Sequence, residues 1–435
     1  MSLFFRYTFV AMKTNRYFLL ALICMSLTSA GAQSRRMTID EVDSIAAHQS
    51  LRLKASLLEI DAAKGQLKQA KAYENPEVQL THNVQNPTNR KWFDTGHDGQ
   101  TDIQVSQPIA IGGQHKNKVR LAEATLKASK AAHDAAMLDV RCEARTTFIE
   151  LYNAQQKLKV YDKEITSTKK IYDTYSDQTD KGNVSKMETF RIATMLNQLR
   201  AEKAELQLYI NELQMQLCLL LDIPGVEPIE TLMDEETEIR SIIDNLAKLQ
   251  SLVAPGNTDI LQDIVQNHPE IIQAKHQEDS AIHAIKAEKS EALPRIALNG
   301  EWDKNGSIGH NFFAVGATLS VPLWNRNKGN IRSAKAKHKQ AAIERQQKEN
   351  ELQASLLTHY RATILNLKLV EEQKQQMSTD LEMLLEAAEQ QFIKRNISVI
   401  EFVDLYSSYR DTKFQMEDAK AQLLKSNEEL KKYTR

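Results

Sequence analysis

The sequence predicts a mainly α-helical protein with a small β part, built as two repeats of a strand hairpin followed by long helices. Two segments bounded by prolines, 76–108 and 294–322, each contain a pair of strand-like alternating stretches. A long proline-free stretch follows each of them, at 114–179 and 328–393. With only 14 Gly and 9 Pro in 435 residues, the composition favours helix over an all-β chain, which would need many turns.

The second half of the chain repeats the first. The matching positions are Pro76 and Pro294, 218 residues apart, Pro108 and Pro322, 214 apart, and Lys181 and Lys394, 213 apart. Most of this small drift falls between the two prolines of each copy, where loop tips tolerate changes of length. We therefore interpret the chain as an ancient duplication of a strand–strand–helix–turn–helix unit.

Residues 1–32 are predicted to be a signal peptide. Lys13 and Arg16 precede an apolar run at 17–25, and a small-residue cleavage site lies at 30–32. The apolar run is too short for a membrane anchor. Met12 is an alternative start, and Cys24 leaves a lipoprotein site open as an alternative.

No later run approaches the roughly 18 apolar residues of a spanning helix, so strands must do any spanning. Charge is balanced, with 56 basic and 57 acidic residues, which gives no attraction to nucleic acid. The mature chain retains Cys142 and Cys218 on predicted helices, and we expect both to be small buried residues. A disulfide between them cannot be argued without geometry.

The first repeat is predicted to cover 33–222. A helix at 38–73 begins with a capping box of Thr38 and Glu41. Strands follow at about 77–84 and 101–107, and then a helix of roughly 65 residues, about 100 Å long. Its heptad seam comprises Met137, Ala144, Leu151, Leu158, Ile165 and Tyr172, with Val140, Thr147, Ala154, Tyr161, Thr168 and Tyr175 three residues behind. A turn at 181–185, with Ser185 as the next N-cap, leads to a helix that ends near 221.

Residues 223–256 are predicted to be a connector with little regular structure, because prolines and glycines bracket an acidic run. The second repeat, 257–435, is expected to contain a helix at 259–292, strands at about 295–302 and 312–321, and a helix at 328–393. A turn and an N-cap at Ser398 then start the last helix.

The strands alternate between apolar and polar or small residues, as strands between lipid and a wet lumen do. The residues expected to face lipid are Val78, Leu80, Ile103, Val105, Ile296, Leu298, Trp302, Phe313, Val315 and Leu319. Four strands cannot close a barrel, and an open edge cannot lie in lipid. The barrel must then be shared between chains, with eight strands from two copies or twelve from three. A soluble periplasmic coiled coil would leave the apolar strand faces unexplained.

Three motifs resemble the TolC-like outer-membrane efflux protein family over essentially the whole mature chain. They are Asn75-Pro76, Ser106-Gln107-Pro108-x-x-x-Gly112-Gly113 and Val321-Pro322-Leu323-Trp324-Asn325-Arg326-Asn327-x-Gly329-Asn330-Ile331. The last motif is most similar to the CzcC/CusC branch, which serves heavy-metal efflux. At this strand-to-helix junction we expect it to turn the chain, with unusual backbone angles at Asn327 and Gly329.

The resemblance implies a homotrimer with a twelve-stranded barrel in the outer membrane of a Gram-negative bacterium, continued by a periplasmic helical tunnel. It also implies a periplasmic adaptor and an inner-membrane RND-type pump as partners. The chain would be a passive exit duct, with heavy-metal cations as the expected substrates. Drug efflux or type I protein secretion are alternatives, and a periplasmic coiled-coil adaptor is a rival of another class.

The resemblance makes the two turns at the far ends of the long helices the sites of adaptor docking. Their residues are Lys181, Gly182, Asn183, Val184, Ser185, Lys394, Arg395, Asn396, Ile397 and Ser398. Acidic residues near these turns could form rings that gate the tunnel, because like charges attract cations and hold a constriction. The candidates are Asp177, Asp180, Glu386 and Glu389.

No catalytic constellation, cofactor motif or metal-ligand cluster is apparent, so neither an enzyme nor a resident cofactor or metal is expected. His276 and His283 lie seven residues apart on a predicted helix, where a solvated face is the simpler interpretation.

Overall fold

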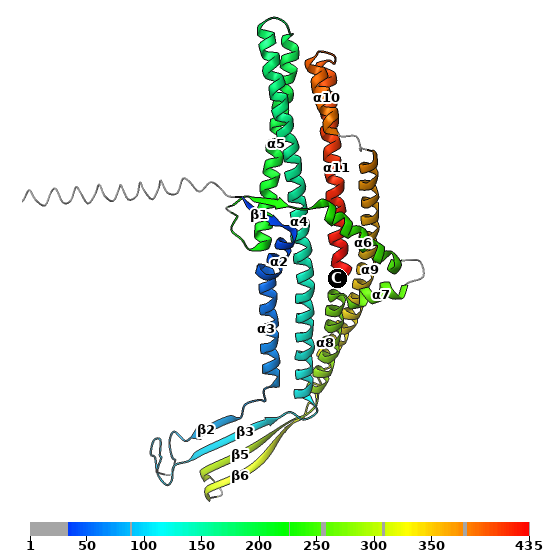
Figure 1. Ribbon diagram of the computed structural model, residues 1–435. Helices are drawn as coiled ribbons and strands as arrows, with labels where there is room; N and C mark the ends of the chain where they lie inside the picture. The colour runs from blue at the N-terminus through cyan, green and yellow to red at the C-terminus, as the bar shows by residue number, and fades with distance from the viewer. Residues whose placement is uncertain are drawn as a thin grey trace, which may run out of the picture. The chain divides into compact units, whose positions relative to one another are not determined.

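Helices make up most of the chain in this computed structural model, and short strands form two small sheets (Figure 1). The structure describes residues 34–87, 89–225, 227–253, 258–306, 309–376 and 381–434. The prediction of a mainly helical protein with a small β part is confirmed. The signal peptide expected at 1–32, including Cys24, lies outside the described residues.

The elements follow one another twice in the predicted order of hairpin, long helix, turn and helix. The first half contains β1 (Arg35–Thr38), α2 (Ile39–Gln49), α3 (Leu51–Lys71), β2 (Glu77–His82), β3 (Thr101–Ile109), α4 (Gln114–Asp180) and α5 (Lys186–Leu221). The second contains β4 (Ile229–Leu232), α6 (Glu235–Val253), α7 (Thr258–Asn267), α8 (Pro269–Glu291), β5 (Arg295–Gly306), β6 (Gly309–Ser320), α9 (Lys328–Gln376), α10 (Leu381–Ile393) and α11 (Val399–Thr434).

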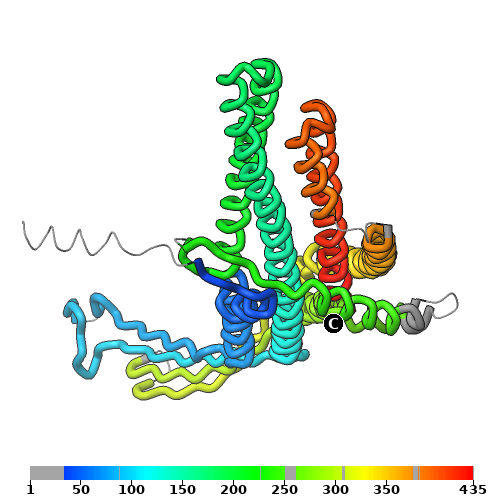
Figure 2. Tube along the Cα trace, turned by 45° about the horizontal axis from the view of Figure 1, so that its top comes forward, coloured from blue at the N-terminus to red at the C-terminus, as the bar shows by residue number. Residues whose placement is uncertain are grey.

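The chain divides into two compact units. Unit one comprises Met1–Ser50, Val140–Asn245 and Arg361–Glu429, and unit two comprises Leu51–Asp139, Leu246–Tyr360 and Leu430–Arg435. Unit one holds α4 from Val140 onward with α5, α10 with most of α11 (Figure 2), and the parallel pair of β1 and β4. Unit two holds the sheet β2-β3-β5-β6 and the helices that lead into and out of it.

Two helices predicted to be continuous are each broken. The helix expected at 38–73 stops at Gln49, because Ser50 is extended, with ψ 125°. The helix expected at 259–292 stops at Asn267, and His268 caps α8 with Pro269 in its first turn. Proline has no N–H and disfavours the helical conformation in the preceding residue, so this second break follows from the sequence.

The expectation of little regular structure at 223–256 is wrong, because β4 and α6 lie there. The acidic run contributes Glu235, Glu236 and Glu238 to the first turn of α6, where negative charge is favourable. Ile242, Leu246 and Leu249 recur at helical spacing and are buried. Pro255 and Gly256 lie outside the described residues.

The predicted heptad seam of α4 is confirmed in unit one. Val140, Ala144, Leu151 and Thr168 are each fully buried. The helix expected at 328–393 in the second repeat is described as α9 and α10, and residues 377–380 between them lie outside the described residues. The capping box that starts α2 is also confirmed, because Thr38 Oγ1 accepts from Glu41 N and the Glu41 carboxylate accepts from Thr38 N.

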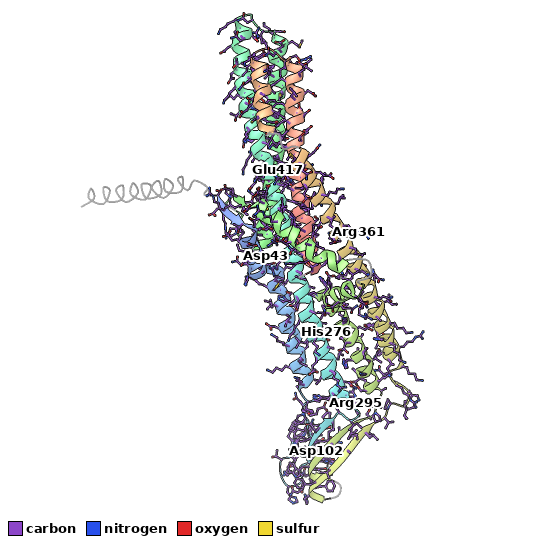
Figure 3. All side chains as sticks on the ribbon, turned by 45° about the vertical axis from the view of Figure 1, so that its right-hand side comes forward. Asp43, Asp102, His276, Arg295, Arg361 and Glu417 are labelled. Atoms are coloured by element: carbon purple, nitrogen blue, oxygen red, sulfur yellow. The ribbon has the colours of Figure 1, made fainter. Side chains whose placement is uncertain are left out.

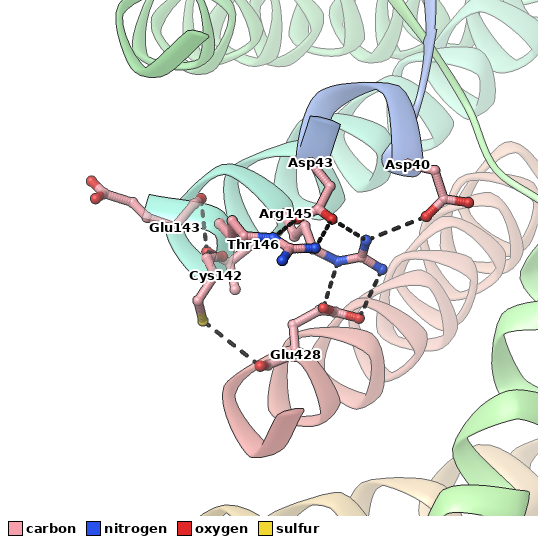
Figure 4. Close-up of polar contacts among 8 residues, drawn as sticks. Asp40, Asp43, Cys142, Glu143, Arg145, Thr146 and Glu428 are labelled. Carbon is pink, nitrogen blue, oxygen red and sulfur yellow. Dashed lines mark hydrogen bonds and ion pairs between the residues drawn. The ribbon is translucent and has the colours of Figure 1, made fainter. Parts of the chain in front are cut away.

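A buried charge cluster ties α2 and α11 to α4 within unit one (Figure 4). The Arg145 side chain is only 5% exposed, and its Nε donates to the Glu428 carboxylate at 2.5 Å. Arg145 Nη1 also reaches Asp40 at 3.4 Å, and Arg141 Nε donates to Asp43 at 2.8 Å. Burial opposes the charge of Arg145, but Glu428 and Asp43 together raise its pKa above the ordinary value.

Glu428→Gln should lower the free energy of unfolding by about 3 kcal/mol, because it leaves the buried Arg145 without its closest countercharge. Thermal unfolding in detergent, followed by circular dichroism, measures this loss. Glu205→Gln on the exposed face of α5 is the control and should change stability little. Equal effects of the two variants would show that the buried pair contributes nothing beyond a surface charge.

Candidate functional site: the helix tips and the two-faced sheet

The turn between α4 and α5 ends its helix with a Schellman motif. Gly182 has a left-handed φ of 74°, and its N–H donates to Thr179 O at 2.9 Å. The N–H of Asn183 donates to Gln178 O, also at 2.9 Å. Ser185 is the N-cap of α5, as predicted, and its side chain accepts from Met187 N. These bonds satisfy the backbone groups that the helix ends leave open.

The turn between α10 and α11 has the same pair of backbone bonds with different chemistry. Arg395 takes the place of Gly182, with φ 61°, and donates to Phe392 O, while Asn396 N donates to Gln391 O. Ser398 caps α11 as predicted and forms a capping box with Glu401. Arg395 Nη2 also reaches Asn183 O at 3.4 Å, so the two turns contact each other.

An aromatic cluster fastens the two hairpins together below these turns. Ile171 and Ile192 from the first hairpin pack with Phe392, Phe402 and Tyr406 from the second. The rings of Phe392 and Phe402 are stacked, with centroids 4.3 Å apart. This cluster holds the tips in one place within unit one.

Apolar side chains next to the turns remain exposed. Met187, Phe190, Ile393 and Ile400 each expose more than 60% of their surface. Between α5 and α11 a groove of about 420 Å³ is lined by Phe190, Met195, Leu199, Val399, Ile400 and Val403, among others. The tips thus present an apolar surface that the described residues do not cover.

The four candidate gate acids differ in their surroundings. Asp177, Asp180 and Glu386 are exposed. Glu389 is half-buried, and its carboxylate accepts from Ser167 and Tyr406. Burial, together with the Glu389 contact, raises the pKa of the Tyr406 phenol. Glu389 therefore already takes part in a bond network within its own protomer.

Sequence reasoning missed a buried acid on α4. Glu164 is 2% exposed, and neither of its carboxylate oxygens has a hydrogen-bond partner among the described residues. Arg410 Nη1 lies 3.9 Å from it and 3.3 Å from Glu202. Burial raises the pKa of Glu164 to about 7, while Arg410 opposes the shift. Glu164 lies three residues after Tyr161 and four before Thr168 of the seam, and this helical spacing could have identified it as buried.

The register of the four-stranded sheet places all ten predicted lipid-facing residues on one face. Val78 pairs with Val105 and Leu80 with Ile103. Ile103 in turn pairs with Trp302, and Trp302 with Phe313. Ile296, Leu298, Val315 and Leu319 share the alternation of this face. Val315 is 94% exposed and Phe313 74%, so much of this face is an apolar surface that the described residues leave uncovered.

The opposite face of the sheet is polar and mainly acidic. Glu77, Asp102, Glu301 and Asp303 lie on it, and Arg295 and His310 are the basic strand residues of this face among those described. Asp102 pairs with Asp303 across the ladder. Figure 3 shows Asp102 within the sheet and Arg295 where β5 begins. Two faces of opposite character are thus built from both repeats.

The junction after β6 is partly as predicted. Asn327 has a left-handed φ of 54°, and its Nδ2 donates to the Glu288 backbone oxygen and carboxylate at 2.9 and 2.6 Å. The expectation for Gly329 is wrong, because this residue lies in the first turn of α9, which begins at Lys328, and its φ is not positive. The side-chain amide of Asn327, which can bond the local backbone, stabilises the turn instead.

The two histidines considered in the sequence, His276 and His283, do not form a metal site in the part of the chain described. His276 is half-buried, and His283 Nε2 lies 3.6 Å from Asp279. No group of three or more His, Cys, Asp or Glu residues converges there to hold a metal ion. Cys142 and Cys218 form no disulfide with each other, and Cys142 Sγ donates to the Glu428 backbone oxygen at 3.8 Å.

None of the described helices has a stretch long and apolar enough to cross a bilayer.

An exposed apolar sheet face, a polar second face and paired helical hairpins define a TolC-like channel protein. The chain belongs to the outer membrane efflux protein family, whose profile matches residues 44–221 and 260–434. The cobalt-zinc-cadmium resistance protein CzcC of Cupriavidus metallidurans is 21% identical over 68% of this chain and 66% of its own length. The nickel-cobalt-cadmium resistance protein NccC of Alcaligenes xylosoxydans xylosoxydans is 21% identical over 63% and 58%, respectively.

The fold is that of solved channel proteins. A crystal structure of CusC, a protein studied for transmembrane channel formation, matches with a TM-score of 0.72 at 16% identity and covers 91% of each chain. The matches to the two resistance proteins span somewhat less than two thirds of their lengths. The family and the fold are therefore established, and the cargo and partners are matters for proposal.

Glu164→Gln should stabilise the protein at pH 8 by about 2–3 kcal/mol and much less at pH 5. A carboxyl group with a raised pKa binds its proton more tightly in the folded state. Below its ordinary pKa of 4.5, Glu164 is protonated in both states and does not lower the free energy of unfolding. The destabilisation then grows as the pH rises to about 7, because the folded state keeps the proton that the unfolded state loses. Thermal unfolding at both pH values measures the difference, with exposed Glu386→Gln as control. A gain that does not depend on pH would contradict this account.

Proposed function

We propose that this protein is the outer-membrane exit duct of a tripartite RND-type efflux system and that heavy-metal cations are its substrates. The observation that carries the proposal is the sheet, whose apolar face is exposed and whose second face is polar. This arrangement suits strands between lipid and a water-filled lumen. The family supports an efflux channel, and the two resistance proteins support metal cations as cargo.

The open edges of the sheet support assembly as a homotrimer. Strands β2 and β6 are the outer strands of the order β2-β3-β5-β6. Their unpaired backbone groups cannot remain in lipid, and four strands cannot close a barrel. Pairing β6 of one copy with β2 of the next satisfies both edges, and three copies give about twelve strands, enough to enclose a channel.

The polar face supports a cation path. Its acids, Glu77, Asp102, Glu301 and Asp303, exceed its bases in each copy, and a trimer would repeat them around the lumen. Rings of carboxylates favour cations over anions in channels. Loose attraction of this kind suits a duct, because cargo must leave as easily as it enters.

The helix tips support docking of a periplasmic adaptor. The exposed apolar residues and the groove between α5 and α11 offer what an amphipathic partner helix would cover. Of the candidate gate acids, Asp177, Asp180 and Glu386 are the ones exposed to a shared tunnel mouth. Glu389 instead serves its own protomer.

Val315→Arg should destabilise the assembled protein by about 2–4 kcal/mol if this residue lies at mid-bilayer. Ala314→Arg, the neighbouring residue on the polar face and opposite Glu301, should assemble normally. Heat resistance of the oligomer on gels, together with native mass measurement, reads out both variants. Equal behaviour of the two would contradict the assignment of the faces.

A cysteine at Asn183 or Ile397 should crosslink to the adaptor in intact cells, because the proposal places both turns at the docking tip. A cysteine at Asp98, in the loop between β2 and β3, is the control and should not. Adaptor capture only from position 98 would reverse the orientation of the protein in the membrane.

Deleting the protein should sensitise cells to divalent ions such as zinc, cobalt and cadmium, in a strain without a redundant channel. Growth across a metal gradient, restored by the wild-type copy, measures this. Unchanged metal tolerance with increased sensitivity to dyes or detergents would point to drug efflux and leave the fold assignment intact.

A further inference from the structure

Two histidines from different repeats meet at the hairpin end of the four-stranded sheet. His97 lies in the loop between β2 and β3, and His310 is the second residue of β6. Their ring centroids are 4.3 Å apart, with planes inclined by 55°. The antiparallel register brings both hairpin turns to the same end of the sheet. The two histidines lie 213 residues apart, the same offset as Lys181 and Lys394, so they occupy corresponding positions in the two repeats.

A carboxylate orients one of the rings. His97 Nδ1 lies 3.1 Å from Asp98 Oδ1. Histidines that bind metals commonly bond a carboxylate through one ring nitrogen and present the other to the ion. This contact therefore makes Nε2 of His97 the nitrogen available for coordination.

The backbone around the pair is braced. Lys304 Nζ donates to Thr95 O and Gly96 O, both at 2.8 Å, and so ties β5 to the loop that carries His97. Asn86 Nδ2 donates to Asp98 O, also at 2.8 Å. A braced frame lowers the entropic cost of holding two ligands around one ion.

We propose that His97 and His310 bind a divalent transition-metal ion, such as copper, zinc, nickel or cobalt, with water completing its coordination. Imidazole suits these ions, and each nitrogen must lie about 2.0–2.1 Å from zinc. The His97 side chain is 77% exposed, so it can rotate to seat an ion. Two protein ligands make a weak, exchangeable site. This inference goes beyond the proposed function, because it needs neither pump nor adaptor.

Copper titration of the full-length protein in detergent, followed by electron paramagnetic resonance, tests the site. Wild type should bind an ion that shows hyperfine coupling to histidine nitrogen. His310→Phe keeps an aromatic ring against His97 but removes its nitrogens, and it should abolish this signal, as should His97→Gln. Asp98→Asn should weaken binding about tenfold or more, because Asp98 positions the ligand.

His115→Ala is the matched control, because His115 also stacks on a ring, that of Tyr73, at 4.6 Å. This variant should bind copper like wild type. Undiminished binding by His310→Phe, or an equal loss in His115→Ala, would overturn the proposal. If the protein binds copper at the pair but deleting it leaves the metal tolerance of cells unchanged, the proposed metal cargo is refuted and the proposed site is not.

The source of the ion can be distinguished in cells exposed to zinc. Zinc bound at the pair should protect His97 from diethylpyrocarbonate, measured by mass spectrometry. Protection only in a strain that retains the inner-membrane pump identifies exported ions, and protection with or without the pump identifies ions from the medium. Either result supports the site, and protection in neither strain contradicts it.

Discussion

The pairing of β3 with β5 is the interaction on which the rest of unit two depends. Each repeat supplies only a two-stranded hairpin, and an isolated hairpin is marginal in water. Eight register pairs, from Asp102–Asp303 to Ile109–Ile296, join the hairpins into one sheet. A slip of one residue would move every side chain to the other face. The same register separates the apolar face from the acids and brings His97 to His310.

Unit one depends on the packing of its helical hairpins. It contains one buried charge that is well paired and one that is poorly paired. Arg145 is deeply buried but bonded to Glu428, so the cost of removing its charge from water is offset. Glu164 is equally buried, yet Arg410 lies 3.9 Å away and is shared with Glu202. Burial without a hydrogen bond raises the pKa of the Glu164 carboxyl, so the packing of the helices around it becomes sensitive to pH.

The two turns show how duplication can keep backbone geometry while the residues change. Gly182 reaches the left-handed region at little cost because it has no Cβ, whereas Arg395 reaches it with a side chain. Arg395 uses that side chain to contact Asn183 O, so the less favourable residue links one turn to the other. The proposal that an adaptor docks at the tips depends on this contact, because it keeps the two turns next to each other.

Periodicity and local chemistry determined much of this protein. The strand alternation identified the ten residues of the apolar face, the heptad seam identified the buried stripe of α4, and Thr38, Ser185 and Ser398 identified helix starts. These features are local, because they follow from the repeat of a helix or strand and from nearby hydrogen bonds. The helix break at Pro269 was also readable from the sequence, and the acidic start of α6 could have been read as a first helical turn.

Only the tertiary structure decided which distant residues meet. The spacing of Glu164 along α4 places it beside the seam, but only the structure shows that it is 2% exposed and that Arg410 of α11 lies 3.9 Å from it. His97 and His310 lie 213 residues apart, at the offset of the two repeats, but this offset does not show that their rings meet. Their contact depends on strand order and register, which pair segments far apart in the chain. Those pairings arise from the whole sheet, and no local pattern of residues specifies them.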